Sequence, residues 1–200
     1  MGGSAALAEG LHNMAYDNFW EIIDATLAED QDQQSKQLTA ELSKLSKEDL
    51  ISFEDSYRTK LREAYHWDLW AAAYIINGGC SDDSFDYFCD WLISRGQKVY
   101  EGALKNPESL IEIATPWETD FEDFRYIMMD VMEAKHGEDF PMPSTSWPTS
   151  PAGDAWDEDT VNAKYPKLSA WVENAVPVKA AHSKASPQKL SFWQRLFGKP

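Results

Sequence analysis

The acidic residues between positions 82 and 86 are the clearest candidates for chemistry in this 200-residue sequence. Asp82, Asp83 and Asp86 fall within about one turn of a predicted helix, and carboxylates at that spacing can hold a divalent cation or act as acid and base. Capping explains the same pattern without a metal, because short acceptors such as Ser81 and acidic side chains stabilise a helix N-terminus. We therefore expect no metal site, with these three aspartates as the weak candidates for one.

Asp68 is the second residue of chemical interest, because it lies between Trp67 and Trp70. Its neighbours should be buried, and a buried carboxylate needs a partner. The candidates are Arg62, Arg95, a tryptophan N–H or a helix-end amide. A structural network of this kind is favoured over a ligand site.

A small pocket, if the chain has one, is expected at the corner marked by Gly78 and Gly79. Aromatic rings would form its apolar walls, and converging helix ends would supply its polar groups. The candidate binding residues are Trp67, Asp68, Trp70, Asn77, Asp82, Asp86 and Tyr87. An aromatic core with satisfied polar residues is the favoured alternative.

The sequence contains no recognised catalytic motif. Cys80 and Cys89 do not form a CxxC pair, and we expect them to behave as small apolar residues. The histidines are scattered, and the signatures of serine hydrolases, phosphate loops and dinucleotide sites are absent. No catalytic residue and no cofactor are predicted, which favours a protein that is not an enzyme.

Charge is the dominant bulk property, since the chain carries a formal net charge of −16. Residues 1–175 hold 13 Lys and Arg against 34 Asp and Glu, a charge of −21, whereas residues 176–200 hold five cations and no acid. Such a body repels phosphate backbones and attracts basic proteins. The sequence therefore predicts no nucleic-acid binding and a possible basic protein partner, with plain solubility as the simpler explanation.

Helices must position these residues, because apolar side chains recur at helical spacing along most of the chain. The longest stretch, opened by Ser46, is either one bent helix or two helices with a short joint. The predicted helices cover roughly residues 17–28, 33–43, 46–77, 81–95, 99–104, 106–113, 120–135, 157–163 and 167–173. No strand pattern competes, so we predict an all-α fold: a single compact multi-helix domain over residues 14–175.

A proline-rich surface loop is expected over residues 138–156, where Phe140, Met142, Trp147 and Trp156 should anchor it to the body. The remaining segments lie at the two ends. Residues 1–13 are expected to be a flexible leader and residues 176–189 a linker.

Residues 190–200 form a short amphipathic aromatic motif in an expected flexible C-terminal tail. Its dense aromatics should dock either on a protein groove or in cis on the acidic body. The expected docking residues are Phe192, Trp193, Arg195, Leu196 and Phe197. The chain has no run of eighteen apolar residues and no signal-peptide region, so we expect no transmembrane segment and a cytoplasmic location.

The segment HWDLWAAAYIINGGCSDDSFDYFCDWLISRGQKVYEGALKNPESL carries a long pattern: W-D-L-W-x-A-A, then G-G-x-S-D-D-x-F-D-Y-F, then W-L-I. It resembles the signature of an uncharacterised bacterial family known only as a domain of unknown function. Phe19 with Trp20, and Tyr165 to Leu168, extend the resemblance to roughly residues 14–172. The resemblance implies a small, soluble, helical bacterial protein and brings no activity with it. Relatives that have Ala at position 80 weaken any role of Cys80 as a nucleophile.

Two functions follow as hypotheses. The favoured one is a non-enzymatic acidic protein-binding or regulatory module, similar to an immunity or adaptor protein, that recognises a basic partner. The alternative is a metal-assisted hydrolase or small-ligand-binding protein that uses the aspartate cluster at the Gly-Gly corner.

Overall fold

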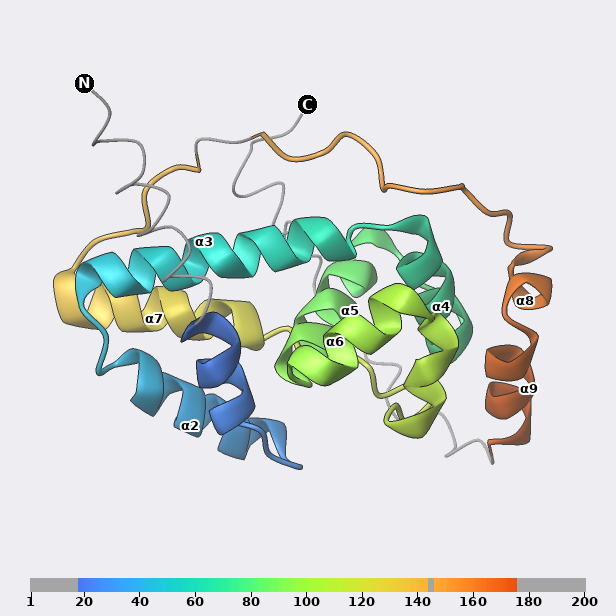
Figure 1. Ribbon diagram of the computed structural model, residues 1–200, viewed down its shortest axis with the longest axis horizontal. Helices are drawn as coiled ribbons and strands as arrows, with labels where there is room; N and C mark the ends of the chain where they lie inside the picture. Colours follow the sequence, from blue (N-terminus) through green and yellow to red (C-terminus); the bar gives the residue numbers. More distant parts are fainter. Residues whose placement is uncertain (1–17, 144–145, 176–200) are drawn as a thin grey trace, which may run out of the picture.

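The computed structural model describes residues 18–143 and 146–175. The described part of the chain is all-helical and contains no strand, which confirms the predicted fold class. Figure 1 shows an elongated body with helices packed along its length. The expected leader (1–13), linker (176–189) and tail motif (190–200) lie outside the described residues.

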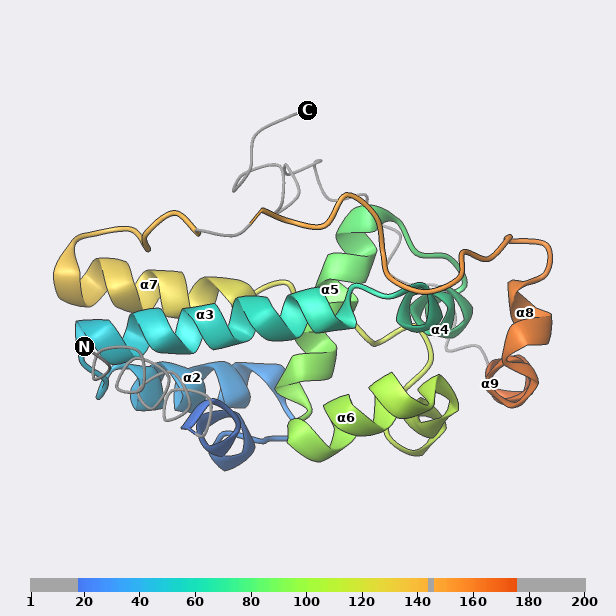
Figure 2. The same ribbon diagram turned by 45° about the horizontal axis from the view of Figure 1, so that its top comes forward.

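Three long helices form one end of the molecule: α2 (Gln31–Leu42), α3 (Lys47–Ala64) and α7 (Phe124–His136). Helix α7 packs against both α2 and α3, and the three run side by side in Figures 1 and 2. A shorter helix over residues 18–25 covers their inner side, where the Phe19 ring lies 4.9 Å from that of Phe53. The apolar stripe of α3 that faces this core comprises Leu50, Phe53, Tyr57, Leu61 and Ala64.

Helix α5 (Asp82–Ser94) is the central element, because it contacts α3, α4, α6 and α7. Helix α4 (Trp67–Asn77) leads into it through the Gly-Gly corner, and α6 (Gln97–Lys105) follows it. Most of α5 is buried, including the polar side chains of Asp86 and Asp90. Its burial on all sides explains why acids within this helix require partners.

The far end of the molecule consists of a 3₁₀ helix, η1 (Pro107–Glu112), and two short helices, α8 (Val161–Lys164) and α9 (Pro166–Asn174). Helix α9 packs against both α4 and η1 (Figure 1). The last described helix, α9, therefore lies beside α4, the helix that leads into the Gly-Gly corner, although about 90 residues separate the two in sequence.

From residue 146 onwards, the segment between α7 and α8 runs over the top of the molecule as an extended strap (Figures 1 and 2). We use "strap" for residues 146–156 of this segment. Trp147 packs on Tyr65 with ring centroids 5.6 Å apart, and Trp156 donates its indole N–H to the carbonyl of Trp67 at 2.9 Å. The predicted anchoring is confirmed for these tryptophans and for the partly buried Phe140, but it is wrong for Met142, which is 73% exposed.

The stretch 46–77 consists of two helices with a short joint, one of the two predicted arrangements. The joint exists because the backbone of Tyr65 and Trp67 bonds to Ala152 of the strap instead of continuing the helix. His66 then caps α4, since its Nδ1 accepts the N–H of Asp68 at 3.1 Å.

Two predicted helix starts were wrong, and one predicted helix is of the 3₁₀ type. Helix α7 begins at Phe124 rather than Asp120, because the N–H of Phe121 bonds to the carbonyl of Tyr87 at 3.2 Å and draws the preceding loop onto α5. The residues 107–112 form a 3₁₀ helix, and α8 begins at Val161 instead of residue 157. Within the described ranges, no helix combines the length and apolar character that crossing a membrane requires.

Candidate functional site

The Gly-Gly corner is built by the caps that the sequence predicts. Gly78 adopts a left-handed conformation (φ 68°) and closes α4 through a bond from its N–H to the carbonyl of Tyr74. Ser81 caps α5 by accepting the N–H of Ser84 at 3.3 Å. Asp82 and Asp83 follow in the first turn of α5, where their charge favours the positive helix end.

Aromatic rings fill the inner side of this corner. The Trp70 ring stacks on Phe85 with centroids 4.7 Å apart and an interplanar angle of 5°, and it also stacks on Trp67 at 5.4 Å. The indole N–H of Trp70 donates to the carbonyl of Cys80 at 3.0 Å. The stack continues along α5 through Phe88, so these rings pack on one another across the corner.

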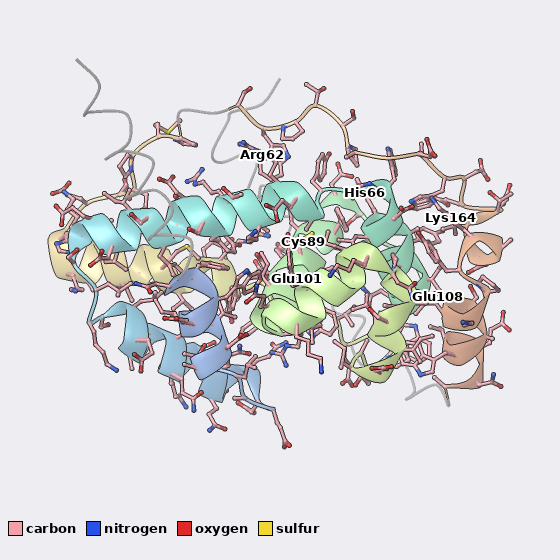
Figure 3. The ribbon with its side chains drawn as sticks, viewed as in Figure 1. Arg62, His66, Cys89, Glu101, Glu108 and Lys164 are labelled. Atoms are coloured by element: carbon pink, nitrogen blue, oxygen red, sulfur yellow. The ribbon has the colours of Figure 1, made fainter. Side chains whose placement is uncertain are left out.

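Asp68 points away from this stack towards α8. It forms an ion pair with Lys164 at 2.6 Å and lies 3.7 Å from Nδ1 of His66 (Figure 3). Burial alone would raise the pKa of Asp68, but hydrogen bonds from Lys164 and Tyr165 and the nearby charges lower it below its ordinary value. The carboxylate therefore joins α4 to α8 as an ion. The partner Lys164 is none of the groups that the sequence suggested.

Asp86 faces the opposite direction and belongs to a buried cluster. Arg125 of α7 lies 3.5 Å from Asp86 and donates its Nε–H to Asp90, which also accepts the hydroxyl of Tyr57. All four of these residues are at most 5% exposed. The cluster ties α3, α5 and α7 together and has little contact with solvent.

Electrostatics keeps this cluster charged. Burial raises the pKa of Asp90 to about 6, against the charge and hydrogen bond of Arg125 and the hydrogen bond of Tyr57. Burial lowers the pKa of Arg125, but Asp90, Tyr57 and Asp86 outweigh it and raise the pKa above its usual range. Because Arg125 stays protonated and its partners hold fixed positions, the cluster acts as a structural clamp rather than a proton donor.

The sequence interpretation missed Asp90 and Arg125. The available signal was the interruption of two apolar stripes, since Asp90 follows Phe88 and Cys89 on α5 and Arg125 follows Phe124 on α7. Two opposite charges, each on an otherwise buried helix face, indicate a pair. Sequence spacing alone does not indicate which charges meet.

The seven candidate pocket residues are thus not brought together around one site. Asn77 accepts a hydrogen bond from Thr119 at 2.9 Å, and Tyr87 lies over the guanidinium of Arg125 with 5.5 Å from Cζ to the ring centroid. Asp82 is exposed at the start of α5. Within residues 18–143 and 146–175, no group of three or more His, Cys, Asp or Glu is arranged to hold a metal ion.

The two cysteines are poor nucleophiles. Burial, followed by the charges of Asp82 and Asp86, raises the pKa of Cys80 to about 12. Burial also raises the pKa of Cys89 well above its ordinary value. A thiol with such a pKa is protonated at neutral pH, and the thiolate is the reactive form.

Acidic residues gather where the loop between η1 and α7 lies against α5, since Glu122 and Asp83 both act on Tyr87, and Glu118 and Glu122 both act on Asp120. We define the acidic face as Asp82, Asp83, Glu118, Asp120, Glu122 and Asp123. The Phe121–Tyr87 hydrogen bond joins the loop to α5, and the Thr119–Asn77 hydrogen bond joins it to the end of α4. No ion pair within the described residues involves Asp82, Asp83, Glu118 or Asp123.

Mutual repulsion is visible at this face. Burial raises the pKa of Tyr87 to about 12, with further contributions from Glu122 and Asp83. Burial also raises the pKa of Asp120, and the charges of Glu122 and Glu118 act in the same direction. The charges of Glu118 and Glu122 therefore disfavour the ionisation of Asp120, and a cation placed among these carboxylates would relieve that repulsion.

Comparison with known proteins identifies one family. Residues 14–134 match the sequence profile of DUF4240, described as a protein of unknown function. The predicted resemblance to such a family is confirmed over that range, and its extension to residue 172 stays a prediction. No curated protein and no solved structure shows a significant match.

Proposed function

Because the chain belongs to the DUF4240 family, whose function is unknown, we propose a function from its own surface: a non-enzymatic acidic module that binds a basic protein partner. The acidic face is the observation that carries this proposal. Four of its carboxylates have no ion-pair partner among the described residues. Two of the four, Asp83 and Glu118, lie close enough to Tyr87 and Asp120 to help raise the pKa of those groups. Lys or Arg side chains of a partner would supply the missing charge.

The overall charge supports the same conclusion. Residues 1–175 carry −21, so the field around the body steers a cationic protein towards it and repels nucleic acid. We include the absence of nucleic-acid binding in the proposal. A bacterial cytoplasmic setting fits it as well, because both cysteines are free and a reducing compartment keeps them so.

The metal-assisted alternative has less support. It requires several aspartates in one coordination sphere, whereas Asp68 pairs with Lys164 and Asp86 pairs with Arg125 on the other side of α4 and α5. Asp82 remains at the exposed helix start. A regulatory or adaptor role, in which binding itself is the activity, needs no such convergence.

Charge reversal on the acidic face tests the proposal. The double variant Asp83→Lys/Glu118→Lys should lose co-purifying basic proteins from a lysate of the source organism, at both low and moderate salt. The double variant Asp139→Lys/Asp154→Lys makes the same change in charge at exposed positions outside the face and should retain them. Equal recovery with both variants, or no basic partner with the unmodified protein, would refute the acidic face as the binding surface.

A further inference from the structure

Trp117 adopts a backbone conformation that its side chain disfavours. Thr115 to Glu118 form a β-turn closed by a bond from the N–H of Glu118 to the carbonyl of Thr115 at 3.1 Å. Pro116 occupies the second position, and Trp117 occupies the third with φ +65°. That position normally holds Gly or Asn, because a Cβ crowds the backbone there.

The side chain of Trp117 is also poorly buried. It is 42% exposed, and Ile113, four residues earlier at the end of η1, is 41% exposed. The indole lies against the Gly-Gly corner, since a Cβ at Gly78 would be 3.4 Å from the indole Nε1. The backbone N–H of Trp117 bonds to the carbonyl of Ile76 at 3.2 Å, which holds the turn on the end of α4.

The protein thus keeps a large half-exposed ring where glycine would suit the backbone better. Glu118 follows it directly, and the rest of the acidic face continues along the same loop and onto α5. An apolar centre with an acidic rim matches a segment that combines aromatic and cationic side chains. Tryptophan can bind both kinds of side chain, because its ring face attracts cations and its large apolar area packs against other rings.

The chain itself contains such a segment. Residues 176–200 carry five cations and no acid, together with the apolar side chains of Leu190, Phe192, Trp193, Leu196 and Phe197. They follow α9, which packs against α4 and η1, the two elements whose ends lie at Trp117. A random coil of the length of residues 176–189 spans about 20 Å on average, and this length of chain separates the end of α9 from the aromatic residues.

We propose that the C-terminal segment 176–200 docks in cis on the surface formed by Trp117 and the adjoining acidic face. Phe192 and Trp193 pack on the apolar centre, and Arg195 and Lys199 neutralise the rim. The segment then occupies the surface assigned above to a basic partner, so a partner must displace it. This regulation rests on the proposed function, whereas the docking itself does not depend on any partner.

Paramagnetic broadening in the full-length protein tests the docking. A nitroxide is attached at residue 191 in the variant Cys80→Ser/Ser191→Cys, where Cys89, only 4% exposed, stays unlabelled. The indole N–H of Trp117 and the amide of Glu118 should lose most of their signal. The amide of Gly137, at the distant end of α7, should keep its signal.

Two further samples make the result decisive. Adding Arg195→Glu and Lys199→Glu should restore the Glu118 signal, whereas Arg195→Lys and Lys199→Arg should not. Mixing isotope-labelled protein that lacks the nitroxide with unlabelled protein that carries it should give no broadening, since docking is in cis. Unchanged Trp117 and Glu118 signals in the first sample, or broadening in the mixture, would overturn the proposal.

Trp117→Gly separates docking from folding. Because the backbone favours glycine at φ +65°, the variant should unfold at a denaturant concentration no lower than the unmodified protein, yet the Glu118 amide should no longer be broadened. Persistent broadening would exclude Trp117 as the docking centre. A negative docking result does not contradict the proposed binding of a basic partner, because the charge-reversal variants test that binding in a separate experiment.

Discussion

The buried charges of α3, α5 and α7 should contribute strongly to stability. Arg125 has almost no contact with solvent and relies on Asp90 and Asp86 for compensation. Glu54 and Arg58 form a second buried pair within α3, four residues apart. Removing one partner of such a pair is costly, because the other charge remains in a medium that solvates it poorly.

Asp90→Asn should therefore destabilise the protein by about 3 kcal/mol in urea unfolding at neutral pH, since Arg125 loses its hydrogen-bonded carboxylate and Asp86 is more distant. Asp130→Asn, at an exposed position of α7, is the control. It should change the free energy of unfolding by less than about 0.5 kcal/mol. A further change of Arg125 to Met in the Asp90→Asn background should recover part of the loss. A loss below about 1 kcal/mol for Asp90→Asn would contradict the role of the clamp.

Glu54 should make stability depend on pH in the acidic range. Burial raises its pKa to about 7, against the charge and hydrogen bond of Arg58, from an ordinary value of 4.5. The folded state therefore holds the proton more tightly than the unfolded state. The contribution of Glu54 to the free energy of unfolding is fully present below about pH 4.5 and is lost as the pH rises through about 7.

Glu54→Gln should remove this dependence. Between about pH 4.5 and 7, the free energy of unfolding should fall less steeply with pH in the variant than in the unmodified protein, by up to about 3 kcal/mol over the range. Urea unfolding at several pH values measures the two slopes. Glu63→Gln, at an exposed position of the same helix, should leave the slope unchanged. Parallel slopes in all three proteins would show that Glu54 is ionised at the same pH in both states.

The sequence predicted the role of residues that act within one helical turn, but it did not predict pairs of residues that are far apart in the chain. Ser81, Asp82 and Asp83 were interpreted correctly as a helix start, because capping depends on residues within one turn. The clamp was missed because Asp90 and Arg125 are 35 residues apart and meet only when α5 packs on α7. The partner of Asp68 was wrong for the same reason, since Lys164 comes from a helix almost a hundred residues later.

At the scale of elements, the joint between α3 and α4 depends on the strap. His66 and Ala152 form an isolated parallel bridge, and the N–H of Trp67 donates to the carbonyl of Ala152 at 2.9 Å. Gly153 follows with φ +83°, and a Cβ there would lie 2.3 Å from Cε1 of His66. Only glycine lets the strap approach the imidazole that caps α4.

Gly153→Ala should thus loosen the strap and destabilise the protein by about 1–3 kcal/mol, because the new methyl displaces His66 and the backbone at φ +83° is strained. Hydrogen exchange should speed up at the amides of Trp67 and Asp68. The control is Gly102→Ala in α6, where the added Cβ makes an ordinary 3.6 Å contact with Ser109 and should stabilise by up to about 1 kcal/mol. Unchanged exchange at Trp67 and Asp68 would argue against the strap as the support of α4.

Element positions were predicted well where a helix contains its own start and stop signals. Ser46, Gly78 and Gly137 lie at the predicted ends of α3, α4 and α7. The start of α7 was placed too early because the acids from Asp120 onwards suit a helix N-terminus locally, yet tertiary hydrogen bonds recruit that loop to α5 and α2. Trp117 had no sequence signal, because its positive φ becomes visible only in the folded turn.

At the scale of the whole molecule, the all-α class and the family followed from periodicity and the aromatic signature, because both are distributed along the chain. The sequence favoured an aromatic core over a converging pocket, but it did not indicate where each polar side chain of the Gly-Gly corner would point. Residues that are close in sequence around the Gly-Gly corner diverge in space, since successive positions of a helix point in different directions. Asp68 and Asp86 consequently serve opposite sides of the molecule.

The strap also has a consequence for how the protein is made. The indole N–H of Trp156 bonds to the carbonyl of Trp67 across 89 residues, so a ribosome must add nearly half the chain after Trp67 before that contact can form. Until then Trp67 and Tyr65 lack the contacts with the Trp156 and Trp147 rings that the strap supplies. The strap also lies beyond residue 134, where the family match ends. A chain that stopped there would retain the helices of the family and leave these rings available for aggregation.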